Sequence, residues 1–306
     1  PLLSTLDAYP GLFFPALAGL LPSGVPLQPA FLLLHLVTSF LFLASAFQLC
    51  TGLCGRRLGA WLLLALLAAG HHAGLSESSL YALGFSHTWV GFALGVAALA
   101  LAVHGRPIAA FLLAGLLVHV HALLGLYSGF LLGCWSLAAM RRYGALHLAA
   151  AWVVGALAAS SALAPMAASA PELNADWVRL VRIRSAHHVF PSAWWRPGDG
   201  RIPRLAMLAG FAALAWSLRP LARRRETLAL LAGPVALAAA GIVFTEWIPR
   251  PVVMRAQLFR ASSFLVLLLL IVSANGLARG VRLAAARYRL RGLAASLLPD
   301  GTWLAA

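Results

Sequence analysis

The sequence contains no lysine, and all 23 of its basic residues are arginine. Aspartate and glutamate together number only eight, so the net charge is +15 at neutral pH. This charge does not indicate a nucleic-acid partner, because the arginines are scattered along the chain and do not gather on one soluble face. We therefore expect no nucleic acid as a partner. The arginine bias, with abundant alanine, glycine, leucine and proline, is typical of a GC-rich bacterial genome.

Charged residues of any kind are scarce. They make up 10% of the 306 residues, whereas hydrophobic residues make up 62% and the mean hydropathy is +0.88. A soluble domain has about 25% charged residues, so this composition excludes one. Several apolar runs could cross a hydrocarbon layer of about 30 Å, which takes about 20 helical residues. The sequence predicts an all-α polytopic protein of the bacterial cytoplasmic (inner) membrane.

Cysteine is also rare, with three residues in the chain. Cys50 and Cys54 share one helical face, but a single CxxxC without a second pair is weak evidence for a metal. Cys134 lies in an apolar run, where a free cysteine behaves as a small hydrophobic residue. No secretory signal peptide is visible, and the chain opens with Pro1, so we expect residues upstream of it.

The apolar runs predict about nine transmembrane helices, within a range of eight to ten. Two of these runs are separated only by "HALLG" and could form one kinked element. The predicted spans are 28–50, 58–73, 88–103, 107–122, 124–140, 145–165, 203–219, 227–246 and 257–275.

Nine spans place the arginine clusters on one side of the membrane, because the clusters fall on alternate connections. The clusters are Arg56-Arg57, Arg106, Arg141-Arg142, the run 219–225 and the run 279–291. The positive-inside rule makes this side cytoplasmic. We expect one transmembrane domain, 1–276, which begins outside with a re-entrant or interfacial segment, 1–27. An outer loop with an interfacial helix, 166–202, and an arginine-rich cytoplasmic tail, 277–306, complete the prediction.

Most of the few acids and most of the histidines fall on the outer side. Asp7 and Glu77 are the candidate catalytic carboxylates, since an outer carboxylate could act as a general base. Glu77 lies in "HHAGLSESSLYALGFSH", so a divalent metal is a possible cofactor there. The candidate metal ligands are His71, His72, His87 and His119. The alternatives stay open: a solvated loop around Glu77, a capping role for Asp7, and core histidines.

The outer segment "DWVRLVRIRSAHHVFPSAWWRP" is amphipathic up to Arg184. Its tryptophans favour the headgroup level of a bilayer, and its arginines suit phosphate groups. The candidate substrate-binding residues here are Arg184, His187, His188 and Trp194. The alternative is an interfacial helix that only caps the bundle.

A second outer segment, "EWIPRPVVMRAQLFRASS", brings Arg255 and Arg260 to the entrance of the last span. An unpaired arginine within the hydrocarbon costs at least about 2.5 kcal/mol on insertion scales. Arg260 therefore needs an anionic partner, for which Glu246, Asp7 and a lipid phosphate are the candidates.

The motifs "DWVRLVR", "RSAHHVFPSAW" and "LVHVHALLG" resemble an uncharacterised bacterial membrane domain family with a GT-C-like fold. The layout is similar to that of GT-C glycosyltransferases. The resemblance implies transfer of a sugar from a polyprenyl-phosphate donor to an acceptor on the outer face. In this family Asp7 would act as the base, and Arg255 or Arg260 would hold the donor phosphate. GT-C enzymes carry the loop acid directly after a first transmembrane helix, which is absent before Asp7 here.

Two other functions compete with this one. The chain could be a non-catalytic accessory subunit of a larger membrane complex, with the arginine-rich tail as a docking helix for protein partners. A haem protein is disfavoured, because no two histidines are placed on one helix at two matched depths. In every case we expect membrane lipids as partners.

Overall fold

The computed structural model describes residues 13–19, 26–70, 72, 74–75, 80, 84–168, 175–184, 186–194, 200–218 and 223–287. These residues form helices and turns, with no β-strand among them. Five helices are long and apolar enough to cross a membrane: Leu27–Cys54, Ala122–Tyr143, Ala145–Ala164, Arg224–Trp247 and Val253–Ala286. The predicted all-α class with membrane-like helices is thus confirmed. The count of nine spans stays a prediction.

Each predicted apolar segment coincides with a helix. These helices are α3 (Leu27–Cys54), α4 (Arg57–Ala69), α5 (His87–Val103), α6 (Pro107–Val120), α7 (Ala122–Tyr143), α8 (Ala145–Ala168), α11 (Arg201–Leu218), α12 (Arg224–Ile242) and α14 (Ser262–Arg287). The segments on either side of "HALLG" are two helices and not one kinked element. His121, with φ −152° and ψ 97°, ends α6 and begins α7. The first part of the predicted tail, up to Arg287, continues α14 without a break.

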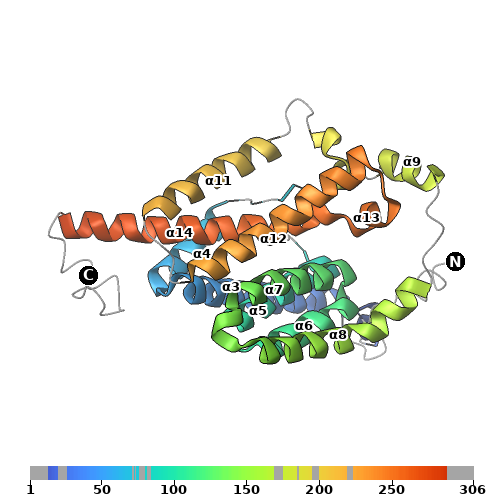
Figure 1. The fold of residues 1–306 in the computed structure, drawn as a ribbon, viewed down its shortest axis with the longest axis horizontal. Helices are drawn as coiled ribbons and strands as arrows, with labels where there is room; N and C mark the ends of the chain where they lie inside the picture. The colour runs from blue at the N-terminus through green and yellow to red at the C-terminus, as the bar shows by residue number, and fades with distance from the viewer. Residues whose placement is uncertain are drawn as a thin grey trace.

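Shorter elements connect these helices. They are α2 (Phe13–Ala18), α9 (Ala175–Arg184), α10 (Ala186–Val189), η2 (Pro191–Trp194), the π-helical turn η3 (Val243–Trp247), α13 (Pro251–Ala256) and η4 (Leu258–Ala261). The predicted amphipathic segment up to Arg184 is indeed helical, as α9. Helices α9 and α13 lie at the same end of the molecule (Figure 1).

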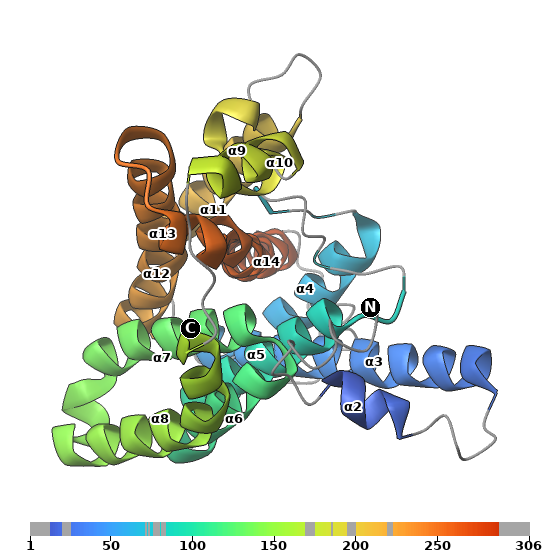
Figure 2. The ribbon, with the colours of Figure 1, turned by 90° about the vertical axis from the view of Figure 1, so that its right-hand side faces the viewer.

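The long helices form two groups, which meet where α12 packs on α7 and α4 packs on α3. In the first group α6 packs between α5 and α8, and α3 packs on α5. In the second group α14 contacts α4, α11 and α12, and the contact of α12 with α7 joins the two groups. Figure 2 shows the second group above the layer of α3, α5, α6, α7 and α8.

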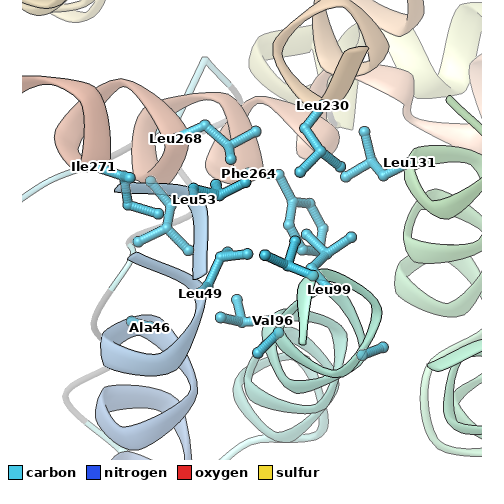
Figure 3. Close-up of a cluster of buried hydrophobic side chains, with 14 of the residues drawn as sticks. Ala46, Leu49, Leu53, Val96, Leu99, Leu131, Leu230, Phe264, Leu268 and Ile271 are labelled. Carbon is cyan, nitrogen blue, oxygen red and sulfur yellow. The ribbon is translucent and has the colours of Figure 1, made fainter. Parts of the chain in front are cut away.

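The core lies where α3, α5, α7, α12 and α14 converge (Figure 3). Leu49, Leu99 and Phe264 contribute to it from three different helices, and each is at most 1% exposed. Glycine allows this close approach, since a Cβ at Gly95 would come within 2.9 Å of the Phe264 ring. Small residues at crossings are the usual way in which membrane helices pack closely.

Two ends of the bundle differ in their polar side chains. The arginine end comprises the α3–α4, α5–α6 and α7–α8 turns and the start of α12. Hydrogen bonds connect these turns: the Arg223 N–H donates to the Leu53 carbonyl at 3.2 Å, and the His104 ring bonds the Gln48 carbonyl at 2.9 Å. The histidine end comprises the starts of α5 and α7 and the segment Gln257–Ser263. The identity of the cytoplasmic end stays a prediction.

Candidate functional site

The N-termini of α5 and α7 meet at the histidine end. His87 is the first residue of α5, His121 is the N-cap of α7, and Ser262 begins α14 directly after η4. The rings of His87 and His121 stack, with 5.0 Å between their centroids and an interplanar angle of 17°. A helix N-terminus carries a partial positive charge and unpaired N–H groups, so this arrangement favours an anion.

His121 presents a hydrogen-bond donor to this site. Its Nδ1 accepts the Leu124 N–H at 3.4 Å, so Nε2 must carry the proton in the neutral ring. Nε2 is buried and has no hydrogen-bond partner among the described residues. Burial, followed by the nearby charges of His87 and Arg260, lowers the pKa of His121 to about 4. The ring is therefore neutral at pH 7 and still donates from Nε2.

A close helix contact holds His121 in place. A Cβ at Gly91 of α5 would meet both the His121 Cβ and the Leu124 Cδ1 at 2.9 Å. Only glycine at this position lets α5 approach the break between α6 and α7. The imidazole position thus depends on packing between two helices and on the N-cap bond within α7.

Arg260 completes the cluster from η4. Its neighbour Phe259 is buried and anchors the turn: the Phe259 ring lies 4.6 Å from the Trp194 ring, and a Cβ at Gly241 would touch it at 2.7 Å. The Arg260 side chain is half-buried, and its Nε is buried without a hydrogen-bond partner in the described part of the chain. No described acid forms an ion pair with it.

A tyrosine from α7 fixes the segment that carries Arg260. The Tyr127 hydroxyl is close to the carbonyls of Ala256 and Gln257, and the bond to Gln257 measures 2.9 Å. Gln257 has φ 45° and ψ 48°, a left-handed conformation that few residues other than glycine adopt. The Gln257 Oε1 is also buried without a partner in the described part. Backbone strain of this kind persists where surrounding contacts hold it.

The electrostatic character of the site is positive and donor-rich. The Arg260 guanidinium, the His121 Nε2–H and the N-termini of α5 and α7 contribute positive charge and hydrogen-bond donors at this end. Of the three described acids, Glu226 belongs to the arginine end, and Glu246 accepts the Ser192 N–H at 2.8 Å. The third, Asp176, lies in the first turn of α9. The arrangement can bind an anion with several oxygen atoms, such as a phosphate.

Several predicted site residues cannot be compared with this cluster. Asp7, His71 and Glu77 lie outside the described residues, and so do the side chains of Arg184, His187 and His188. Arg255 is exposed in the last turn of α13. Trp194, which we predicted at the membrane surface as a substrate contact, is buried against Phe259 and so supports the turn that holds Arg260.

The described members of the predicted metal set do not come together. His72 bonds the Leu66 carbonyl at 2.9 Å, His119 bonds the Ala158 carbonyl at 3.0 Å, and His87 stacks on His121. Within the described ranges, no group of three or more His, Cys, Asp or Glu side chains could hold a metal ion. The bond to Ala158 fits the alternative interpretation of His119 as a core histidine, and a metal-binding role for the set stays a prediction.

Sequence reasoning missed part of the cluster. The i, i+2 spacing of His119 and His121 correctly suggested that the two rings face different surroundings, but it did not show which one faces the site. Tyr127 and Gln257 carried no signal, because one is an isolated tyrosine in an apolar run and the other a lone amide. Their proximity depends on packing of α7 against the α13–η4 segment.

No family model matches the chain, and neither a curated protein sequence nor a solved structure matches it.

Proposed function

We propose that the protein is a GT-C-type glycosyltransferase that takes a sugar from a polyprenyl-phosphate donor on the extracytoplasmic face. In this proposal the cluster of Arg260, His121 and His87 binds the donor phosphate. The supporting observation is the buried Arg260 Nε, which has no partner among the described residues although the guanidinium is charged at any physiological pH. A phosphate oxygen would supply the missing acceptor and the missing negative charge.

The proposed reaction uses this cluster to stabilise the leaving group. An acceptor hydroxyl oxygen attacks the anomeric carbon, and the bond from that carbon to the phosphate oxygen breaks. Its electron pair remains on the phosphate, whose growing charge Arg260 and the Nε2–H of His121 stabilise. A carboxylate takes the hydroxyl proton, and Asp7 is the candidate for this role, with Glu77 as the other acid of the outer side.

Donor recognition can be tested with the lipid alone. We would measure the melting temperature and affinity of the purified chain in detergent with a polyprenyl phosphate and with the polyprenol of equal length. We expect only the phosphate to stabilise the protein. Arg260→Gln should weaken its binding at least tenfold, because the guanidinium faces no competing acid of the described chain. Arg250→Gln is the matched control, since it removes the same charge from an exposed side chain at the start of α13.

Turnover requires a second measurement. The release of polyprenyl phosphate from hexose- and pentose-bearing donors, with a glycan acceptor, should be lost in both Arg260→Gln and Asp7→Asn. Full binding by Arg260→Gln together with full turnover by Asp7→Asn would contradict the proposal. Phosphate-specific binding without turnover of any donor would favour the accessory-subunit alternative.

A further inference from the structure

A hollow with a mainly apolar lining lies at the opposite, arginine end and takes no part in the proposed transfer. It has a volume of about 580 Å³ and lies between α3 and α5. Volumes of about 300–1,000 Å³ are typical of small-molecule sites. Its walls are small: Ala44 and Ser45 come from α3, and Ala97 and Ala100 come from α5. We call this hollow the arginine-end groove.

The groove interrupts a face of α3 that is otherwise covered with large apolar side chains. Leu36 and Phe40 are exposed on this face, Phe40 to 75%, and Ala44 and Gln48 follow at the same four-residue spacing. Residues four apart lie on one side of a helix. An exposed apolar face on a helix long enough to cross a membrane suits contact with lipid chains.

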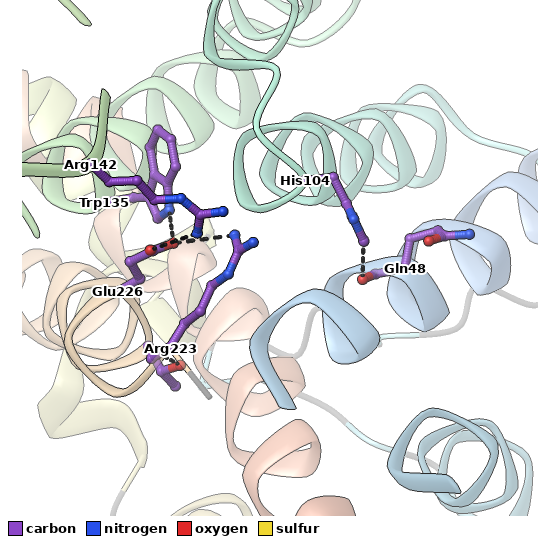
Figure 4. A network of polar contacts seen from close by, with 7 residues as sticks. Gln48, His104, Trp135, Arg142, Arg223 and Glu226 are labelled. Carbon is purple, nitrogen blue, oxygen red and sulfur yellow. Dashed lines mark hydrogen bonds and ion pairs between the residues drawn. The ribbon is translucent and has the colours of Figure 1, made fainter. Parts of the chain in front are cut away.

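The end of the groove is polar and positively charged. Gln48, His104 and Arg106 line it, and Figure 4 shows the His104 ring of α5 bonded to the Gln48 backbone carbonyl of α3. Arg106 is exposed and pairs with no acid of the described residues. It is also the N-cap residue of α6, whose first turn adds a partial positive charge. The apolar trough thus ends at a cationic site.

We propose that an anionic phospholipid of the adjacent leaflet binds in the arginine-end groove. Its acyl chain lies over Ala44 and Ala97, and its phosphate pairs with Arg106. This charge complementarity favours a lipid over an apolar helix as the occupant, because an apolar helix would leave Arg106 uncompensated. Basic pockets between transmembrane helices are known to bind acidic headgroups.

Native mass spectrometry of the full chain in detergent tests this site. Phosphatidylglycerol and phosphatidylcholine with identical acyl chains would be titrated separately, with melting curves to confirm that each variant folds. We expect tight, saturable binding of one phosphatidylglycerol and weaker binding of phosphatidylcholine. Arg106→Gln should reduce the phosphatidylglycerol affinity about tenfold by removing the phosphate contact, a loss of about 1.4 kcal/mol. Ala44→Leu should reduce it similarly by filling the exposed wall of the groove.

Arg141→Gln is the matched control, since Arg141 is an exposed arginine at the same end that does not line the groove. If Arg106→Gln and Arg141→Gln reduced the phosphatidylglycerol affinity equally, the proposal would be overturned. The lipid would then bind to the general positive charge of this end and not to the groove. Unchanged binding in Ala44→Leu, and in Ala97→Leu as a second filling variant, would also overturn it. So would competition by soluble glycerol phosphate, or a second copy of the chain cross-linked through Ala44→Cys.

Discussion

The two ends of the bundle treat their cationic side chains in opposite ways. At the arginine end, Arg142 and Arg223 lie 3.7 and 3.6 Å from the buried Glu226 carboxylate, which also accepts the Trp135 indole N–H at 2.8 Å (Figure 4). At the histidine end, Arg260 has no such partner among the described residues. A compensated charge joins helices together, whereas an uncompensated one is available to a ligand.

The largest expected effect is at the compensated end. Glu226→Ala should lower the free energy of unfolding by about 2 to 4 kcal/mol, because it leaves the buried Trp135 N–H without its acceptor and the Arg223 guanidinium without its ion-pair partner. Glu226→Gln keeps an acceptor for Trp135 and should lose about half as much. Denaturant titrations in detergent would measure both. Wild-type stability in Glu226→Ala would contradict a structural role for this network.

A glycine pair tests how closely the histidine end is packed. Gly91→Ala should destabilise the fold by about 1 to 3 kcal/mol, since the new methyl group would collide with His121 and Leu124. Gly129→Ala on α7 is the control, because a Cβ there would meet nothing within 4 Å and alanine favours a helix by about 1 kcal/mol. Thermal melts should shift in opposite directions for the two variants, and equal shifts would contradict the packing argument.

Arg260→Gln, unlike Glu226→Ala, should not lower the free energy of unfolding. Removal of a half-buried charge without an acidic partner in the described chain should leave stability unchanged or raise it by up to about 1 kcal/mol. Melting temperatures without added lipid would show this. A loss as large as that of Glu226→Ala would indicate a hidden acidic partner for Arg260 and would erase the difference between the two ends.

The smallest effect is a pH dependence of stability without ligand. His121 lies between α6 and α7, and its pKa falls from the usual 6.5 to about 4 on folding. Between these values the unfolded chain binds more protons, so the free energy of unfolding decreases as the pH falls from about 6.5 to about 4. His121→Asn keeps an N-cap acceptor but should flatten this slope. Unfolding titrations at pH 7, 5.5 and 4.5 would detect the change, and an unaltered slope would exclude His121 as its source.

The apolar segments were predictable because helix formation across a membrane depends on local composition. All nine segments proved helical, and the "HALLG" connection alone was ambiguous, since a single extended residue separates two helices there. The metal hypothesis failed to gain support for a different reason. His72 bonds the Leu66 carbonyl of α4, and His119 bonds the Ala158 carbonyl of α8, so the two rings face different helices.

Arg260 illustrates the difference between what the sequence predicts and what only the tertiary structure shows. Its need for an anionic partner followed from composition, because a charge beside hydrocarbon is costly wherever the fold places it. The neighbours that define its site, His87, His121 and Tyr127, are more than 100 positions away in the chain. The hydropathy of a segment and the positions of its charged residues are local properties of a few helical turns. They were therefore sufficient to predict where the helices lie. Only the packing of α5, α7 and η4 against one another brought the donors of that site together.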